Sequence, residues 1–256
     1  MIGRTELATE FAELGLAPGA SVLVHSSLRS LGHVAGGAGT VVDALLDAVG
    51  KEGTVMVPNL PFRGSLNRYL ETDPTFDVRT TPSRMGAVTE ALRKRPKARR
   101  SLHSSHSAAV VGALRDEMTR DHETCDLTCG VTSPYYRNAH RPNGFVLMIG
   151  VDLHCMTTFH AVEETNELPY MFSGKVYAST VIDYEGSPLT IRTRGYVDGV
   201  KRDFTSPEPL LLKEGLITIG KVAEAECRFM DAQGTFDCVE RAVRKDPFFL
   251  LAERPA

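Results

Sequence analysis

The chain has 256 residues, of which 42% are hydrophobic and 24% charged, a composition typical of a globular domain long enough to bury a sizeable core. Its formal net charge of -3 gives no reason to expect nucleic acid or an anionic membrane as a partner. No apolar run approaches the roughly 18 residues that a membrane span needs, and residues 1–16 form an amphipathic helix pattern without the apolar region of a secretory leader. We therefore expect a single cytoplasmic domain over residues 1–256.

The chain contains five cysteines, an odd number. Three residues lie between Cys125 and Cys129, a spacing that does not fit a CxxC redox or zinc pair. We therefore expect free thiols and no metal site at Cys125, Cys129, Cys155, Cys227 and Cys238.

Apolar residues that recur with a period of about 3.6 predict helices at residues 4–15, 40–49, 84–95 and 109–121. Short β-branched runs predict buried strands at Ser21–Val24, Thr54–Val57 and Phe145–Ile149. Strand, helix and strand over residues 21–57 form a βαβ pattern, which favours a mostly parallel sheet covered by helices.

The second half of the chain has a different pattern. Two strands joined by a Glu-Gly-Ser-Pro turn predict a hairpin laid against the α/β body, and a short helix, two more strands and a closing helix follow. We therefore expect an α/β fold, with a mostly parallel central sheet, flanking helices and an antiparallel C-terminal appendage. The predicted ranges are 175–183 and 189–194 for the hairpin, 210–214 for the short helix, 217–223 and 227–231 for the strands, and 233–245 for the last helix.

A polar loop follows the first predicted strand. His25–Leu28 and the glycine-rich residues 36–39 lead to Thr40, at the expected N-cap of the next helix. The N–H groups at a helix start suit the phosphates or amide groups of a nucleotide-like cofactor. The GxGxxG and GxxxxGK[ST] motifs are absent, which excludes the Rossmann and P-loop readings. A tight turn capped by serines explains the loop equally well.

Residues 93–107 place six basic side chains before a run of serines and histidines. Basic groups followed by hydroxyls bind phosphate through charge-assisted hydrogen bonds, so the segment indicates an anionic cofactor such as the phosphorylated end of CoA. A solvated basic helix end is the alternative. A serine hydrolase is disfavoured because no GxSxG motif is present.

Residues 157–167 form the most informative stretch. Thr157 or Thr158 is expected to cap a helix on which His160, Glu163, Glu164 and Glu167 share one side. Such a face is either a solvated surface or a site for a cationic ligand. An amine arrives as an ammonium and must lose a proton before it attacks, and a neutral imidazole is the natural base. A carboxylate one turn away can orient the ring, whereas the absence of HExxH makes a metal-dependent hydrolase remote.

Several stretches together resemble the aminoglycoside 3-N-acetyltransferase family, the acetyl-CoA-dependent antibiotic N-acetyltransferases. They are VHSSLRSLG (24–32), FDVRTTPSRMGAVTEALR (76–93), RRSLHSSHSAAVVG (99–112), CGVTSPY (129–135), VLMIGV (146–151) and TTFHAVEE (157–164), with looser likeness at RDF (202–204), EPLL (208–211) and DPFFLL (246–251). The resemblance implies a fold unlike that of GCN5-type acetyltransferases. It also implies direct transfer of an acetyl group from acetyl-CoA to the 3-amino group of the 2-deoxystreptamine ring of an aminoglycoside.

The resemblance also implies roles for individual residues. His160 would be the general base, Asp198 its orienting acidic partner, and Glu163 a second carboxylate near the ring or the substrate. The substrate's ammonium groups would be held by Asp77, Glu163, Glu164 and Glu167. The CoA site would be lined by His25, Ser26, Ser27, Leu28, Arg79, Thr80, Ser83, Ser101, His103 and Ser107.

The chain departs from the family pattern at three points. Ser104 replaces the proline of the family's HPxxS motif, Asn59 stands where a small hydroxyl residue is usual, and tryptophan is absent. These changes leave the acceptor open. The alternatives are an N-acyltransferase for a biosynthetic amine and a non-catalytic CoA-binding protein. Under any of these functions we expect a monomer or a homodimer.

Overall fold

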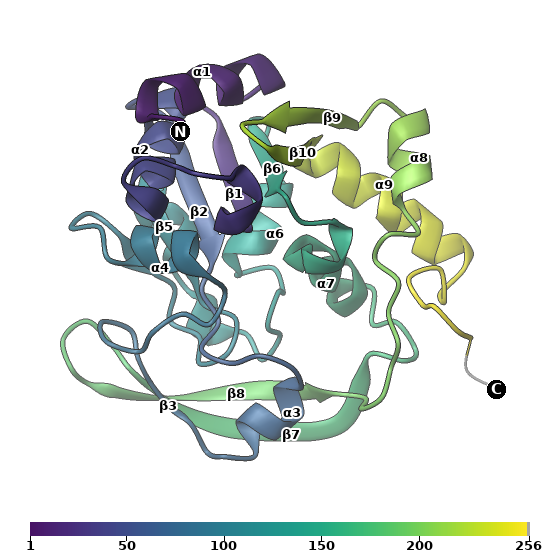
Figure 1. Cartoon of the computed structure of the whole chain (residues 1–256). Helices are drawn as coiled ribbons and strands as arrows, with labels where there is room; N and C mark the ends of the chain where they lie inside the picture. Colours follow the sequence, from purple (N-terminus) through teal and green to yellow (C-terminus); the bar gives the residue numbers. More distant parts are fainter. Residues whose placement is uncertain (255–256) are drawn as a thin grey trace.

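The structure is a computed structural model that describes residues 1–254. It contains two sheets, and Figure 1 shows the smaller one lying across the bottom of the molecule. The strands are β1 (Ser21–Ser26), β2 (Thr54–Pro58), β3 (Thr75–Asp77), β4 (Arg99–Arg100), β5 (Ala108–Gly112), β6 (Gly144–Ile149), β7 (Phe172–Ile182), β8 (Pro188–Tyr196), β9 (Ile217–Val222) and β10 (Ala225–Asp231). The large sheet has the order β4-β5-β2-β1-β6-β10-β9, and the small one β3-β7-β8.

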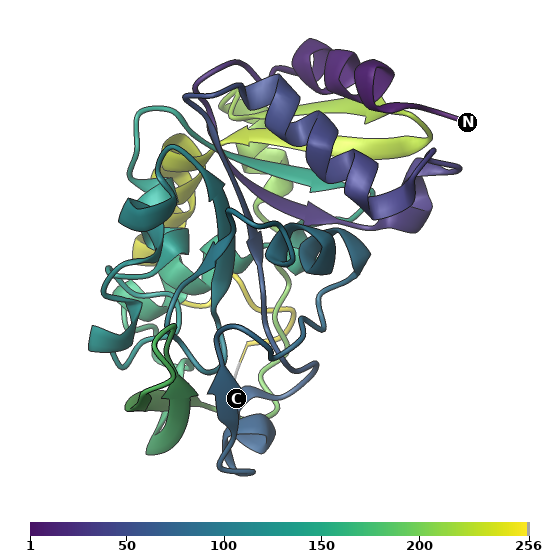
Figure 2. The same ribbon diagram turned by 90° about the vertical axis from the view of Figure 1, so that its left-hand side faces the viewer.

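Helices cover both faces of the large sheet (Figures 1 and 2). They are α1 (Arg4–Leu14), α2 (Gly37–Val49), α3 (Leu66–Leu70), α4 (Ala87–Arg93), α5 (Arg115–Thr119), α6 (Pro134–Ala139), α7 (Thr157–Thr165), α8 (Glu208–Lys213) and α9 (Ala232–Lys245), with 3-10 turns η1 (Leu28–Leu31), η2 (His122–Thr124) and η3 (Leu153–Cys155). The first, second and fourth helices pack on one face, and α6, α7 and α9 on the other. No helix among the described residues is long and apolar enough to cross a bilayer.

The central strands are buried on both faces, as their unbroken apolar runs predict. Because side chains alternate along a strand, Leu23 of β1 packs into the core under α6, α7 and α9, whereas Val22 and Val24 pack into the core under α1 and α2. All five cysteines are free thiols in the structure.

The α/β class is confirmed, but the large sheet is mixed rather than mostly parallel. Only the neighbouring pairs β2–β1 and β1–β6 are parallel, whereas β5 is antiparallel to β2 and β10 is antiparallel to β6. Strands β4 and β5 are also antiparallel, as are β9 and β10, and the short connections within these two pairs allow no other arrangement. The β7–β8 hairpin is confirmed, and β3 adds to it in parallel.

Three local predictions were wrong. The predicted helix at 109–121 is strand β5 followed by the short α5, because a run of four or five buried apolar residues suits a strand as well as a helix. Helix α2 begins at Gly37, with Gly36 rather than Thr40 at its N-cap and a φ of 78° that favours glycine. Helix α7 has Met156 at its N-cap and no capping hydrogen bond from a threonine side chain.

The candidate site lies where the parallel strands end. The carboxyl ends of β2, β1 and β6 meet at one edge of the sheet, which is where α/β proteins commonly bind ligands. Strand β6 leads through η3 directly into α7, and the second sheet lies below that helix in Figure 1. The fold therefore places α7 between the sheet edge and the hairpin.

Candidate active site

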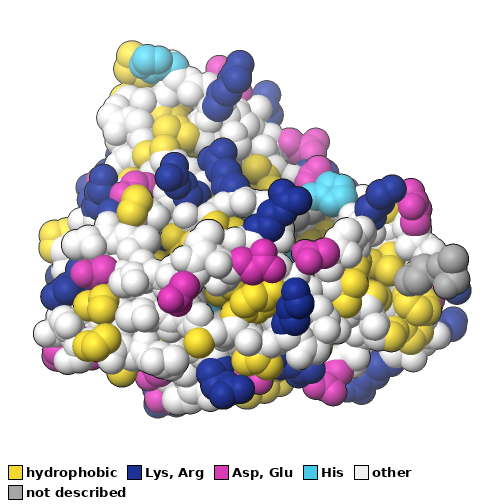
Figure 3. All heavy atoms as spheres, turned by 90° about the horizontal axis from the view of Figure 1, so that it is seen from below, with side chains coloured by type: hydrophobic (Ala, Val, Ile, Leu, Met, Phe, Trp, Pro, Cys, Tyr) yellow, Lys and Arg dark blue, Asp and Glu magenta, His cyan; other side chains and the backbone are white. Residues whose placement is uncertain are grey.

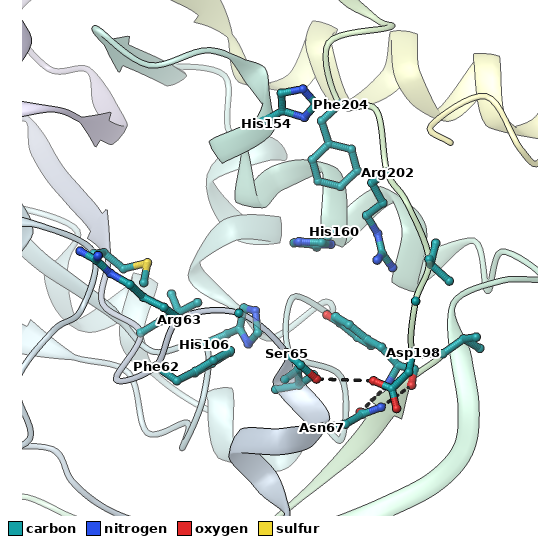
Figure 4. A pocket seen from close by; sticks show the side chains of 18 residues that line it. Phe62, Arg63, Ser65, Asn67, His106, His154, His160, Asp198, Arg202 and Phe204 are labelled. Carbon is teal, nitrogen blue, oxygen red and sulfur yellow. Dashed lines mark hydrogen bonds between the residues drawn. The ribbon is translucent and has the colours of Figure 1, made fainter. Parts of the chain in front are cut away.

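A cleft of about 460 Å³ lies beside α7. Its walls come from α7, from residues 60–67 that follow β2, and from residues 196–204 that follow β8. Figure 4 shows side chains from all three segments converging on it. Its ionisable lining residues are Arg63, His106, His154, His160, Asp198 and Arg202.

His160 projects from α7 and is held by a buried carboxylate. Its Nδ1 lies 2.7 Å from Oε2 of Glu163, one helical turn further along. The His160 side chain is 23% exposed and that of Glu163 is 0% exposed. Arg202 approaches from the segment after β8, and its Nε donates to Oε1 and Oε2 of Glu163 at 2.7 and 3.0 Å. Hydrogen bonds thus link Arg202 to Glu163 and Glu163 to His160, and the His160 ring lies at the cleft.

The protonation of Glu163 decides what His160 can do. Burial alone would raise the pKa of Glu163, but the hydrogen bond from His160 and the positive charge of Arg202 outweigh burial, so its pKa lies below the usual value. An ionised carboxylate only accepts hydrogen bonds, so Nδ1 of His160 carries the proton that it donates. In the neutral ring, Nε2 then keeps a free lone pair, as a general base requires.

The structure corrects the role expected for Asp198. The partner that orients the His160 ring is Glu163, because it lies one turn away on the same helix. Asp198 lies beyond the end of β8, where it accepts a hydrogen bond of 3.4 Å from Ser65 Oγ. Figure 4 shows it beside Ser65, apart from the His160 ring. Asp198 nevertheless lines the cleft and forms no ion pair among the described residues.

None of the four carboxylates expected to bind the substrate lines the cleft. Glu164 is fully buried, and its oxygens accept hydrogen bonds from Thr128 Oγ1, Tyr196 OH and the Cys129 N–H at 2.6, 2.6 and 2.7 Å. Glu167 lies after α7 ends and pairs with Arg194 at 2.9 Å. Asp77 pairs with Arg79 at 3.0 Å beside the second sheet, and the hydrogen bond from Arg79 lowers the pKa of Asp77 to about 2. Of the four, only Glu163 contacts His160.

Glu164 is therefore expected to stabilise the fold rather than bind substrate. In Glu164→Gln, the amide group places N–H donors where Cys129 or Thr128 also donates, leaving a buried donor unsatisfied. We expect a loss of about 1–3 kcal/mol in the free energy of unfolding, measured by urea denaturation. Glu167→Gln is the matched control, because the Glu167 side chain is 69% exposed. Substitutions of exposed residues usually change the free energy of unfolding by less than about 0.5 kcal/mol. Unchanged stability together with a raised KM for the amine would place Glu164 in the substrate site instead.

The residues expected at the CoA site are scattered. Ser101, His103 and Ser107 are fully buried, because the connection from β4 to β5 folds inward and Ser107 Oγ donates to the Ser101 carbonyl at 2.7 Å; their predicted contact with CoA was wrong. His25 is buried at the end of β1, and burial lowers its pKa to about 3. Ser26, Ser27 and Leu28 are half-buried beyond it, and Arg79 and Thr80 are exposed beside the second sheet.

Ser83 lines a second hollow next to the cleft. This hollow has a volume of about 710 Å³ and shares Phe62 and Arg63 with the cleft beside His160. Arg63 and Arg84 line it, and neither forms an ion pair within residues 1–254. We call this second hollow the Arg63–Arg84 groove.

Sequence reasoning missed Arg202, His106, Arg63 and Arg84 as site residues. The RDF stretch that resembles the family contains Arg202, and this was a usable signal. Arg63 lies in a loop without any recognised motif. His106 lay in a segment that was assigned to CoA binding as a whole, yet it is the residue of that segment that lines the cleft.

Comparisons with known proteins identify the family. The chain is similar to aminoglycoside N(3)-acetyltransferase VII of Streptomyces paromomycinus, with 34% identity over 72% of this chain and 65% of that protein. It is also similar to aminoglycoside N(3)-acetyltransferase III of a Salmonella species, with 31% identity over 90% of this chain and 87% of the relative. The crystal structure of aminoglycoside acetyltransferase AAC(3)-Xa superposes with a TM-score of 0.79 and 28% identity, covering 98% of this chain and 95% of that one.

The likeness to this solved structure confirms the expected antibiotic N-acetyltransferase fold. A sequence model described as aminoglycoside 3-N-acetyltransferase matches residues 23–244, so the match spans the central strands, α7, His160 and the segment that contains Arg202. The chain belongs to the aminoglycoside 3-N-acetyltransferase family of acyltransferases.

Proposed function

We propose that the protein transfers the acetyl group of acetyl-CoA directly to a primary amine in the cleft, with His160 as general base. The family predicts the 3-amino group of the 2-deoxystreptamine ring of an aminoglycoside as the acceptor. One observation carries the proposal: Nδ1 of His160 is hydrogen-bonded to the buried carboxylate of Glu163. The guanidinium of Arg202 also contacts this carboxylate and favours its ionised form. This arrangement supplies a base and the countercharge that the protonated base needs.

The proton and the bonds balance as follows. The neutral amine nitrogen attacks the thioester carbonyl carbon, and His160 Nε2 takes the proton that the nitrogen sheds as the C–N bond forms. The Glu163 carboxylate stabilises the resulting imidazolium. The C–S bond then breaks, and the imidazolium returns its proton to the departing CoA thiolate. The products are the acetamide and free CoA.

The Arg63–Arg84 groove supports acetyl-CoA as the donor. Arg63 and Arg84 offer two guanidinium groups without carboxylate partners in the described part of the chain, and guanidinium groups bind phosphate oxygens in pairs of hydrogen bonds. Ser83 adds a hydroxyl. With its phosphates in this groove, the acetyl end of the molecule would lie in the adjoining cleft beside His160.

One observation favours an acceptor other than an aminoglycoside. Among the described residues that line the cleft, Asp198 is the single carboxylate, and Arg63 and Arg202 bring positive charge. Figure 3 shows basic and acidic side chains mixed over the face seen from below, with no single acidic field. A polyammonium drug binds best where several carboxylates converge. A CoA-dependent N-acyltransferase for an amine with fewer charges is therefore the second candidate.

Release of free thiol from acetyl-CoA tests both candidates. The assay would compare aminoglycosides with a free 3-amine, the same drugs with that amine blocked, and simple amines carrying one ammonium. Turnover that requires the free 3-amine supports the first candidate, and turnover restricted to simple amines supports the second. Absence of thiol release with every amine, while acetyl-CoA still binds, would contradict both and leave a CoA-binding protein.

Asp198 is expected to hold the acceptor's ammonium group. Replacing it with asparagine removes a charged hydrogen-bond partner worth about 1.5–3 kcal/mol, so KM for the amine should rise about 10-fold to 100-fold with little change in kcat. Asp77→Asn is the control, because Asp77 lies outside the cleft and pairs with Arg79. A raised KM in Asp77→Asn and an unchanged KM in Asp198→Asn would reverse the assignment.

A further inference from the structure

A second imidazole lies beside the proposed base. His106 belongs to the connection between β4 and β5, is 4% exposed and lines the cleft. Its ring centroid lies 6.3 Å from that of His160, and the two planes are nearly perpendicular, at 85°. Figure 4 shows both rings facing the same space from different elements. The mechanism above assigns His106 no role.

The protonation of neighbouring His103 is fixed by the backbone. Its Nδ1 accepts hydrogen bonds from the N–H groups of Ser105 and His106, at 3.3 and 3.1 Å. Burial is the largest cause that holds the pKa of His103 well below its usual value, and the nearby histidines add to it. The ring is therefore neutral. A neutral ring that accepts at Nδ1 carries its proton on Nε2. The Nδ1 lone pair is therefore already occupied.

The hydroxyl of Ser105 then fixes the protonation of His106. Its Oγ lies 3.0 Å from Nδ1 of His106 and 3.3 Å from Nδ1 of His103. A hydroxyl has one hydrogen to donate, and the lone pair of His103 is already shared by two backbone N–H groups. Ser105 therefore donates to Nδ1 of His106, the nearer and unoccupied acceptor. Burial keeps His106 neutral by holding its pKa well below the usual value, so its proton lies on Nε2.

The His106 ring is held in place. Phe62 contacts its edge with a centroid distance of 5.8 Å, and Phe62 stacks on Tyr69 at 4.7 Å. The Tyr69 hydroxyl donates to the Ser104 carbonyl at 3.0 Å, which anchors the same connection. Within residues 1–254, Nε2 of His106 has no hydrogen-bond partner and is not among the buried unpaired atoms. The result is a fixed, unused N–H donor in the wall of the cleft.

We propose that His106 Nε2–H donates a hydrogen bond to the thioester oxygen of acetyl-CoA and stabilises the oxyanion that forms when the amine attacks. This inference rests on the proposed function. The attacking nitrogen and the oxyanion are bonded to the same carbon. The base must therefore reach the nitrogen, and the donor the oxygen, each through a hydrogen bond of about 2.8 Å. The 6.3 Å between the rings leaves that space. A fixed donor in a dry site suits this task, and a neutral imidazole is a known electrophile.

The direct test is the C=O stretching frequency of 13C-labelled acetyl-CoA bound to the protein, measured by difference infrared spectroscopy without any amine. We expect a shift to lower frequency in the wild-type protein, its loss in His106→Leu and its retention in His106→Gln, whose amide Nε2 occupies the place of the imidazole Nε2. An unshifted carbonyl in the bound wild-type complex, or an equal shift in His106→Leu, would overturn the proposal.

Kinetics give the second readout. Loss of one oxyanion donor typically lowers kcat about 10²-fold to 10³-fold, so we expect this fall in His106→Leu and most of the activity in His106→Gln. The dissociation constant for acetyl-CoA should stay within about 3-fold, because one hydrogen bond to a neutral carbonyl adds little in the ground state. Equal falls in both variants would indicate a packing role only.

Two outcomes separate this inference from the proposed function. A shifted carbonyl in wild type without thiol release for any amine would contradict the function and keep the donor. Thiol release with an unshifted carbonyl would keep the function and remove the donor. If His106→Leu fails to fold, 15N NMR of the histidine side chains in the wild-type protein gives the test. The proposal requires a protonated Nε2 and an unprotonated Nδ1 at His106. The opposite tautomer would overturn the proposal.

Discussion

Replacing His160 with alanine is expected to lower kcat by about 10²-fold to 10⁴-fold, the usual loss when a general base is removed. The ring is 23% exposed and projects into the cleft, so its truncation leaves the core of α7 intact. Glu163 keeps its hydrogen bonds from Arg202. The melting temperature and the dissociation constant for acetyl-CoA should therefore remain close to those of the wild type. Thiol release under saturating substrates measures the effect.

The matched control is His154→Ala. His154 lines the same cleft, but its side chain forms no hydrogen bond with a carboxylate among the described residues, and only its backbone N–H contacts Asp152. We expect kcat to change less than a few-fold. If His154→Ala shows the large fall and His160→Ala does not, the base has been assigned to the wrong histidine.

Replacing Arg202 with methionine is expected to give the largest loss of stability in the site. Glu163 is 0% exposed, and Arg202 holds both of its oxygens. Breaking a buried ion pair by removing one partner costs about 3–5 kcal/mol, because the remaining charge stays buried without compensation. The free energy of unfolding at neutral pH, measured with urea, should fall by this amount, and kcat should fall as well because the His160 partner loses its anchor.

The pH dependence of this loss follows from the sign of the Glu163 shift. Its pKa in the folded protein lies below the usual 4.5, because His160 and Arg202 together outweigh burial. Such a carboxylate stabilises the fold above its unfolded pKa, and this contribution disappears as the pH falls through the folded pKa. The stability difference between wild type and Arg202→Met should therefore be largest near neutral pH and shrink as the pH falls below about 4.5.

Arg228→Met provides the matched control for Arg202→Met. Arg228 also pairs with a carboxylate at 2.7 Å, but the Glu208 side chain is 22% exposed, so water can replace the lost guanidinium. We expect a smaller loss of stability, about 0–1 kcal/mol as for other solvated pairs. Equal losses in the two variants, or a loss in Arg202→Met that does not change with pH, would contradict an ionised and buried Glu163.

The proposed base and the proposed oxyanion donor come from different parts of the chain. His160 lies on the helix that follows β6, and His106 on the connection that leads into β5. Each ring is set by a local partner, Glu163 for one and Ser105 for the other. The opposite tautomers that result, with the proton on Nδ1 of His160 and on Nε2 of His106, give the cleft one proton acceptor and one proton donor.

The sequence alone was sufficient for features that depend on local periodicity. Unbroken apolar runs revealed β1, β2 and β6 because a strand buried on both faces has no polar positions. The spacing of His160 and Glu163 placed them on one side of a helix, and the structure brings them to 2.7 Å. The motifs that resemble the family were also local, and the comparisons support the family they indicated.

Contacts between distant segments could not be read from the sequence. Glu164 shares the helical face of Glu163, yet it is buried because Thr128 and Tyr196, from two other segments, donate to it. Arg202 reaches Glu163 from 39 positions away. The sequence predicts a helix where strand β5 lies, because short apolar runs fit both periods. Periodicity reports which side of an element faces inward, but only the tertiary structure decides which charges meet there, since hydrogen bonding and burial depend on the segments that pack together.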